Sequence, residues 1–160
     1  MIDVRLGDAR LVLEKEIQEN SEKFDILAID AFSDDSIPVH LLTKEAFEIY
    51  EKKIRTEGII AYHISNIYLD LSKILIPLCH EFDINCALVK NKSVPESRIY
   101  SSVWFVMSKN DNFFNYLNNY NNENVKITFR DKSERPKSRY WTDDRNNILP
   151  LLKIFSFKIF

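Results

Sequence analysis

The stretch FDILAIDAFSDDSIPVHLLTKEAFEIY, residues 24–50, predicts a buried strand, a polar loop and a helix in succession. The strand is apolar over residues 26–29 and ends at Asp30. Pro38 closes an acidic loop, and from Thr43 onward apolar side chains recur at helical spacing. A carboxylate at the carboxyl end of a buried strand, ahead of a helix, is where open α/β sheets place ligand chemistry. The alternative is an ordinary turn whose acids cap the next helix.

The rest of the chain alternates predicted strands with predicted helices. Strands that alternate with helices of about a dozen residues indicate βαβ units and a mostly parallel sheet. The last two expected strands follow each other too closely for a long helix between them, which predicts one antiparallel strand at an edge. This is the architecture of Rossmann-like, methyltransferase-type α/β sheets. The expected strands are 1–6, 26–29, 58–64, 85–89 and 101–108, and the expected helices begin after Gly7, at Thr43, after Asn66 and after Asn110, with a final one at 145–154.

Glycine and proline mark some of the expected boundaries. We expect Gly58 to end the helix that begins at Thr43. Pro77 is expected to bend the following helix or to divide it into two short pieces. Gly7 and Gly58 are the only glycines in the sequence. This count excludes both a G-x-G-x-x-G phosphate-binding turn and the G-x-S-x-G elbow of a serine hydrolase.

Composition indicates one globular domain over residues 1–160. Hydrophobic residues make up 45% of the chain, charged residues 29%, and the net charge is −2, so nothing predicts nucleic-acid binding. Cys79 and Cys86 lack metal-ligand spacing and predict buried thiols in a reducing, cytoplasmic compartment. No cluster of histidine, cysteine and aspartate predicts a metal site. Without a run of 18 apolar residues, the chain itself is not expected to span a membrane.

Several motifs in order resemble the spermidine synthase family. The closest resemblance is to a bacterial branch in which that domain is often fused to a membrane transporter-like region, so the parent protein could be anchored through a region that precedes this chain. The resemblance covers roughly residues 1–110 and one later segment. The motifs that carry it are Gly7-Asp8-Ala9-Arg10, the strand that ends at Asp30, Pro38 to Phe47, GIIAYHISNIYLDL at 58–71, and Trp141-Thr142-Asp143-Asp144.

This resemblance implies roles for particular residues. Asp8, next to Ala9, matches the acid that hydrogen-bonds the adenine of the donor, decarboxylated S-adenosylmethionine. Asp30 matches the acid that orients and deprotonates the attacking amine. Residues 31–38 match a gate over the site, and the gate and substrate residues are then Ser33, Asp34, Pro38 and His40. The donor is a co-substrate, so no permanently bound cofactor is expected.

The implied chemistry suits these residue types. An amine is mostly protonated at neutral pH, so a carboxylate must bind it as a cation and then accept a proton. The sulfonium donor is also positively charged, and an acidic pocket that closes would hold both reactants together. The expected partner is therefore a small-molecule amine.

One departure from the family pattern concerns the acceptor. Members that make spermidine usually carry a second acid three residues after the catalytic one, where this chain has Ser33. Either Asp34 takes over diamine binding after a small loop shift, or the acceptor is not putrescine.

A larger departure is that the first two strands of the family sheet are missing, together with their glycine-rich loop. In the family sheet these strands lie between the third and fourth strands, here expected at 1–6 and 26–29. Their absence would leave apolar edges that require a partner. The edges could pair with each other, be covered by another copy of the chain, or be covered by a missing N-terminal segment. We expect a truncated domain.

The remaining polar residues near the predicted site have structural alternatives. His63 and Asn66 flank the end of the third expected strand, and Asp143 and Asp144 could cap the final helix. We therefore expect a spermidine synthase-like aminopropyltransferase domain of polyamine biosynthesis with Asp30 as its base. The alternatives are methyl transfer from S-adenosylmethionine and a remnant or binding module without activity.

Overall fold

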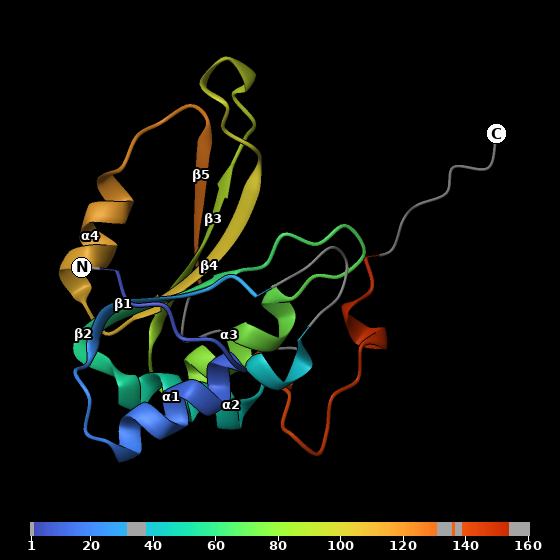
Figure 1. Cartoon of the computed structure of the whole chain (residues 1–160). Helices are drawn as coiled ribbons and strands as arrows, with labels where there is room; N and C mark the ends of the chain where they lie inside the picture. Colours follow the sequence, from blue (N-terminus) through green and yellow to red (C-terminus); the bar gives the residue numbers. More distant parts are fainter. Residues whose placement is uncertain (1, 32–37, 131–135, 137–138, 154–160) are drawn as a thin grey trace.

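The described part of the chain forms one α/β fold around a five-stranded sheet. The computed structural model describes residues 2–31, 38–130, 136 and 139–153. The sheet order is β1-β2-β4-β3-β5 (Figure 1). The strands are β1 (Phe24–Ile29), β2 (Ile54–His63), β3 (Asn85–Asn91), β4 (Ser102–Ser108) and β5 (Val125–Arg130). The α-helices are α1 (Ala9–Gln18), α2 (Lys44–Lys53), α3 (Ser72–Glu81) and α4 (Asp111–Asn119), and short 3₁₀ turns are η1 (Val39–Leu41), η2 (Pro95–Ser97) and η3 (Leu149–Leu151).

Strand directions confirm the expected fold class and add one strand to it. β1 and β2 are parallel, and β4 runs antiparallel to both of its neighbours, β2 and β3. β3 therefore runs in the same direction as β1 and β2, and β4 is the expected reversed strand. The expected position at an edge was wrong, because β4 lies between β2 and β3. β5, antiparallel to β3, lies in a region for which no strand was expected. Its sequence VKITFR lacks the strong apolar run that marks the central strands, and three of its side chains are partly buried and three exposed.

Helices α1, α2 and α3 lie on one side of the sheet (Figure 1). The apolar face of α2 is fully buried there, with Ala46, Phe47 and Tyr50 at 0% exposure. Thr43 caps the helix, because its Oγ1 accepts a hydrogen bond from the Ala46 N–H at 3.3 Å. The sequence therefore located this helix correctly from its cap and its apolar spacing.

A buried ion pair links α1 to α2. Lys53 and Glu16 are both buried, with 1% and 7% of their residue surface exposed. The Lys53 ammonium lies 2.7 Å from the Glu16 carboxylate. Lys53 also donates to the Glu22 carbonyl at 2.8 Å and to the Ser21 hydroxyl. A buried charge is tolerated only when it is paired and hydrogen-bonded in this way. The contact holds the chain entering β1 against the end of α2.

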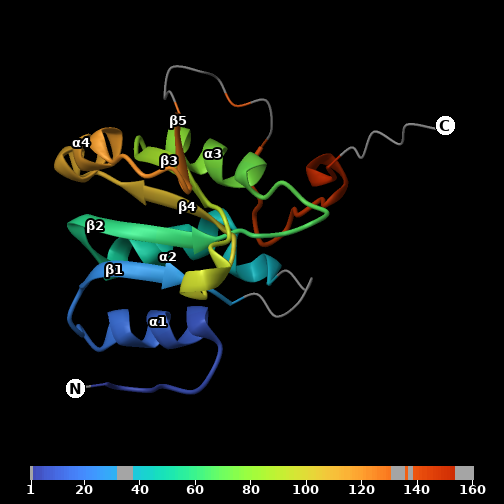
Figure 2. The ribbon, with the colours of Figure 1, turned by 90° about the horizontal axis from the view of Figure 1, so that it is seen from above.

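The N-terminal segment is not the strand that the sequence predicted. Residues 2–6 have no regular structure, and Ile2, Val4 and Leu6 are 92%, 75% and 93% exposed. Figure 2 shows that this segment lies beyond α1, on the side away from β1. Its alternating apolar pattern lacks a neighbouring strand among the described residues, and a strand requires such a neighbour for its backbone hydrogen bonds. The outer edge of β1 is likewise unpaired within the described ranges.

Gly58 does not end α2, as the sequence had suggested. α2 ends at Lys53, and β2 begins at the next residue, so Gly58 lies inside β2. A Cβ at this position would come within 2.9 Å of the Arg55 carbonyl oxygen. Gly58 therefore allows a close backbone approach inside the strand.

Two further boundaries differ from expectation. Pro77 lies inside α3, which runs continuously from Ser72 to Glu81, so of the two expected effects of Pro77, a bend or a division into two pieces, the division was wrong. The final helix expected at 145–154 is reduced, within the described residues, to the 3₁₀ turn η3. Pro150 lies in that turn, and proline lacks the N–H that a longer helix would need.

The two cysteines agree with the prediction from the sequence. Cys79 and Cys86 are buried and not joined by a disulfide. None of the described helices is long and apolar enough to cross a membrane.

Two buried tyrosines allow a test of the core. Tyr50 and Tyr62 are both 0% exposed, and burial raises the pKa of each phenol. The Tyr50 hydroxyl donates to the Leu41 carbonyl at 3.2 Å, whereas no described residue hydrogen-bonds the Tyr62 hydroxyl. We expect Tyr50→Phe to lower the free energy of unfolding by about 1 kcal/mol and Tyr62→Phe to leave it unchanged or raised, because only the first removes a hydrogen bond. Urea unfolding of the two variants measures both effects, and an equal loss in both would contradict this assignment.

Candidate functional site

The parallel pairing of β1 with β2 places Asp30 beside His63. Ile29, the last residue of β1, pairs with Tyr62, the residue before His63. The Asp30 Oδ1 lies 2.7 Å from the His63 Nδ1. The Asp30 side chain is 57% exposed, and no described residue bonds to its second oxygen, Oδ2. Asp30 therefore lies at the carboxyl end of the strand with a largely exposed side chain and with one carboxylate oxygen that no described residue binds.

The His63 ring is fixed on its other sides. It stacks on the Trp104 side chain, with ring centroids 4.9 Å apart and planes at 23°. Its Nε2 lies 2.7 Å from the Ser65 Oγ, and that oxygen accepts a hydrogen bond from the Val103 N–H at 2.8 Å. A continuous hydrogen-bonded chain therefore runs from the Asp30 carboxylate through His63 and Ser65 to the backbone of β4.

Asp8 lies at the N-terminus of α1, with both of its carboxylate oxygens in use. Oδ1 accepts hydrogen bonds from the N–H groups of Arg10 and Leu11 at 3.0 and 3.1 Å, and Oδ2 lies 2.8 Å from the His40 Nε2. The hydrogen bond from the Leu11 N–H, with further help from His40, holds the pKa of Asp8 below its ordinary value. Asp8 is therefore ionised at neutral pH, and caps the helix whose first residue is the exposed Ala9.

A second acid, Asp143, joins the same region from far along the chain. The Arg10 guanidinium binds both of its carboxylate oxygens at 2.8 Å, and the Thr43 hydroxyl donates to Oδ1 at 2.8 Å. The Asp143 N–H in turn donates to the Glu45 carboxylate at 3.0 Å. The bond from Arg10 holds the pKa of Asp143 below its ordinary value. Asp143 thus connects α1 to the start of α2, and the expectation that it caps a final helix was wrong.

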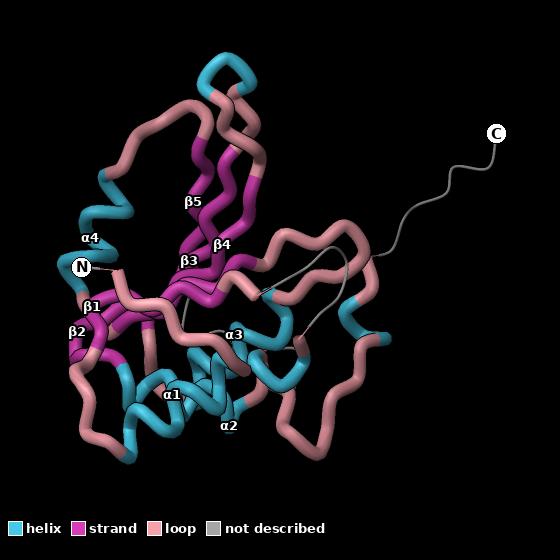
Figure 3. The backbone as a smooth tube through the Cα atoms, in the orientation of Figure 1, coloured by secondary structure: helices cyan, strands magenta, loops and turns pink. Residues whose placement is uncertain are grey.

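Arg10, His40 and Asp143 border a cleft of about 500 Å³ beside η1. Figure 3 shows loops extending from the carboxyl end of β2. Asp30 and His63 lie at that end, because Ile29 pairs with Tyr62. Three of the motifs that resembled a known family meet at the cleft, from the start of α1, the start of α2 and the segment around Asp143. The lining residues are Arg10, Pro38, Val39, His40, Thr43, Asp143 and Asn146.

The structure brings some of the predicted site residues together and separates others. Asp8 contacts His40, but Asp30 contacts neither, and it pairs instead with His63. Ser33 and Asp34 lie outside the described residues. Roles for Asp8, Ala9, Asp30, Pro38 and His40 in binding or catalysis stay predictions.

Three contributors to these contacts were not expected from the sequence. Ser65 follows His63 by two residues, a spacing that could have suggested a shared partner. Arg10 and Asp143 are 133 residues apart, so no local sequence pattern predicts their pairing. The Trp104 ring reaches His63 only because β4 pairs with β2 in a register that places the two residues opposite each other.

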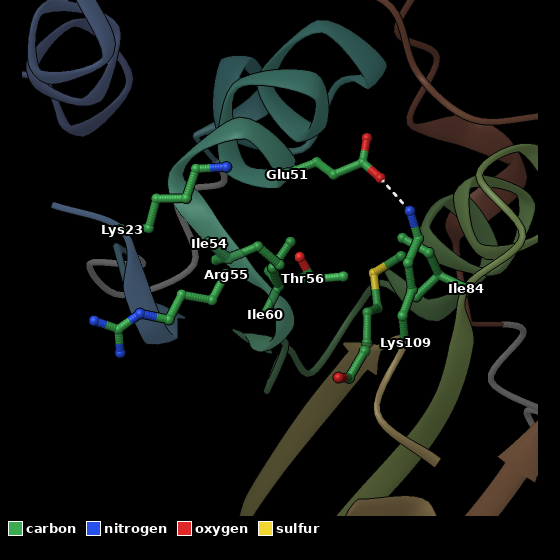
Figure 4. Close-up of a pocket in the computed structure, with 10 residues that line it drawn as sticks. Lys23, Glu51, Ile54, Arg55, Thr56, Ile60, Ile84 and Lys109 are labelled. Atoms are coloured by element: carbon green, nitrogen blue, oxygen red, sulfur yellow. Dashed lines mark hydrogen bonds and ion pairs between the residues drawn. The ribbon is translucent and has the colours of Figure 1, made fainter. Parts of the chain in front are cut away.

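A different cleft, of about 190 Å³, lies at the other end of β2 (Figure 4). It is lined in part by Ile54 and Thr56, where β2 begins, and by Lys109, which reaches Glu51 at 2.7 Å. Its Arg55 is paired with Asp25. Asp30 therefore lies at the opposite end of the strands from this cleft. In the described ranges no three histidine, cysteine or acidic side chains are grouped as metal ligands would be.

Comparison with known proteins supports the fold. No known family model matches this sequence, and no curated protein sequence matches it. The structure is similar to the crystal structure of a probable spermidine synthase from Corynebacterium glutamicum, with a TM-score of 0.55 and 18% identity. The match covers 86% of this chain and 53% of that one, so this chain spans about half the length of its neighbour. The likeness establishes a methyltransferase-like α/β fold.

Asp143 and Asp144 provide a matched test of the link between α1 and α2. Asp144 is exposed and makes no contact like those of Asp143 among the described residues. We expect Asp143→Asn to lower the free energy of unfolding by about 1 kcal/mol at pH 7 and Asp144→Asn to leave it unchanged. Because folding depresses the pKa of Asp143 below its ordinary 3.8, the stabilisation is complete well above that pH and is lost as the pH falls below it.

Urea unfolding at pH 7 and at about pH 3 measures this dependence. The difference between the Asp143→Asn variant and the unmodified protein should be smaller at the lower pH. A difference of the same size at both pH values would contradict an ionic origin.

Proposed function

We propose that this chain is a spermidine synthase-like aminopropyltransferase domain of polyamine biosynthesis, in which Asp30 binds the attacking amine and accepts its proton. The observation that carries this proposal is the position of Asp30 at the carboxyl end of β1, with a side chain that is 57% exposed and only one oxygen, the one held by His63, hydrogen-bonded to a described residue. The fold, similar to that of a probable spermidine synthase, supports it. We also propose that the protein is located in the cytoplasm.

The proposed reaction needs a base and electrostatic attraction. The amine nitrogen attacks the carbon of the aminopropyl group that is bonded to the donor sulfonium, a new C–N bond forms, and the C–S bond breaks. The electron pair of that bond neutralises the sulfonium and leaves a thioether, methylthioadenosine. The cationic amine has no free electron pair on its nitrogen, so one of its protons passes to Asp30 before the attack. Before transfer, the Asp30 carboxylate attracts the cationic amine and helps to hold it in line with the donor.

In this proposal the donor binds at the start of α1. Asp8 would accept a hydrogen bond from the adenine amino group, next to Ala9. Its Oδ2 is already bonded to the His40 ring, but a carboxylate oxygen has a second lone pair available. In this proposal Pro38 and His40 border the gate, and Ser33 or Asp34 within it sets the choice of acceptor amine.

Replacement of Asp30 tests the proposed base. Asp30→Asn in the natural full-length protein should lower aminopropyl transfer at least about 100-fold while donor affinity stays within a few-fold, because the amide cannot accept the proton. Asp25→Asn is the control: Asp25 is an exposed acid on the same strand, paired with Arg55. Methylthioadenosine release measured by chromatography reports transfer, and calorimetry reports donor binding. Unchanged turnover in Asp30→Asn would rule out this role.

The choice of donor separates aminopropyl transfer from methyl transfer, which the same fold supports. We expect decarboxylated S-adenosylmethionine to bind at least about tenfold more tightly than S-adenosylmethionine, because an acidic site repels the carboxylate of the latter. Calorimetry with both compounds measures the ratio. A preference for S-adenosylmethionine would favour a methyltransferase, and binding of neither would favour a domain without activity.

A further inference from the structure

We propose that His63 and Ser65 are positioning residues that hold the Asp30 carboxylate with Oδ2 directed at the substrate amine. This inference rests on the proposed function, because it assigns how the base of that reaction is oriented. Its basis is the hydrogen-bonded chain of Asp30 Oδ1, His63 Nδ1, His63 Nε2 and Ser65 Oγ, with contacts of 2.7 Å at each end of the ring.

Hydrogen-bond accounting selects one tautomer of His63. An ionised Asp30 can only accept, so the proton lies on Nδ1 and is donated to Oδ1. In a neutral ring Nε2 is then an acceptor, and its partner is the Ser65 hydroxyl. The Ser65 oxygen meanwhile accepts the Val103 N–H at 2.8 Å, which leaves its own hydrogen free to be donated to Nε2. Every donor in this chain meets an acceptor, and the ionised Asp30 carboxylate, which can only accept, sets its direction.

The same connectivity occurs in the serine, histidine and aspartate triads of hydrolases, where serine is the reactive end. In this protein the aspartate, not the serine, is the most accessible end of the chain. The Asp30 side chain is 57% exposed and that of His63 is 26% exposed, while the Ser65 oxygen already accepts a backbone N–H. The substrate-facing end is therefore the carboxylate, and Ser65 is the anchored end.

The surroundings of the ring restrict its motion. Trp104 stacks against one face at 4.9 Å, and pairing of His63 with Trp104 across β2 and β4 fixes both backbones. With Oδ1 bonded to Nδ1, the Asp30 side chain cannot rotate freely, and Oδ2 keeps no hydrogen-bond partner among the described residues. A carboxylate that is held by such a partner needs less reorganisation when the amine binds.

A spectroscopic experiment tests the tautomer without any substrate. The full chain is labelled with ¹⁵N in its histidine rings, and the His63 signal is identified by its loss in His63→Gln. We expect the Nδ1–H tautomer in the unmodified protein and a mixture of tautomers in Ser65→Ala, while Ser93→Ala, a serine whose hydroxyl donates to the Ile99 carbonyl, should leave the signal unchanged. The Nε2–H tautomer in the unmodified protein would overturn the proposal.

A pair of variants tests the consequence for transfer. In His63→Asn the amide nitrogen takes the place of Nδ1, whereas in His63→Gln it reaches the place of Nε2. We expect His63→Asn to retain kcat within about threefold and His63→Gln to lose about 10- to 100-fold in kcat, with a smaller change in KM. Equal losses in the two variants would overturn the positioning role. Circular dichroism of both variants checks that they are folded.

The two experiments separate this inference from the proposed function. Aminopropyl transfer accompanied by the Nε2–H tautomer would overturn the positioning role and leave the proposed function intact. The Nδ1–H tautomer in a protein that transfers no aminopropyl group would overturn the proposed function, and the role of His63 in that reaction with it.

Discussion

The parallel register between β1 and β2 is the constraint on which the candidate site depends. Pairing of Ile29 with Tyr62 brings the next residues of the two strands, Asp30 and His63, to the same end of the sheet. A shift of one residue would turn one of the two side chains to the opposite face, because side chains alternate along a strand. The burial of Ile60 and Tyr62 against the helices prevents that shift. Core packing thus sets the geometry of polar groups that contribute little to the core.

A second set of contacts organises the loops around this end of the sheet. Arg10, Thr43 and Asp143 belong to segments that are distant in sequence, and their charge-assisted hydrogen bonds hold those segments together. Asp8 and His40 connect α1 to η1 in the same region. The three acids therefore differ in availability: Asp8 and Asp143 hold parts of the fold together, whereas Asp30 keeps one oxygen to which no described residue is hydrogen-bonded.

Much of the fold could be predicted because apolar spacing, caps and turns are local signals. The strand before Asp30, the Thr43 cap and the antiparallel β3–β4 pair follow from such signals. β5 was missed because its side chains are only half-buried, and residues 1–6 were misassigned because an alternating pattern does not say whether a neighbouring strand exists. Gly58 was misjudged because the passage from α2 into β2 is direct.

The sequence by itself determined the α/β class, the location of Asp30 at a strand end and the helix that begins after Gly7, since each depends on residues near one another along the chain. Only the tertiary structure decided which acids remain free and which are paired. Those pairings depend on side chains 33 residues apart for Asp30 with His63 and 133 apart for Arg10 with Asp143. Such contacts exist only once strand register and helix packing have brought the backbones together, because a hydrogen bond acts over about 3 Å and leaves no trace in local spacing.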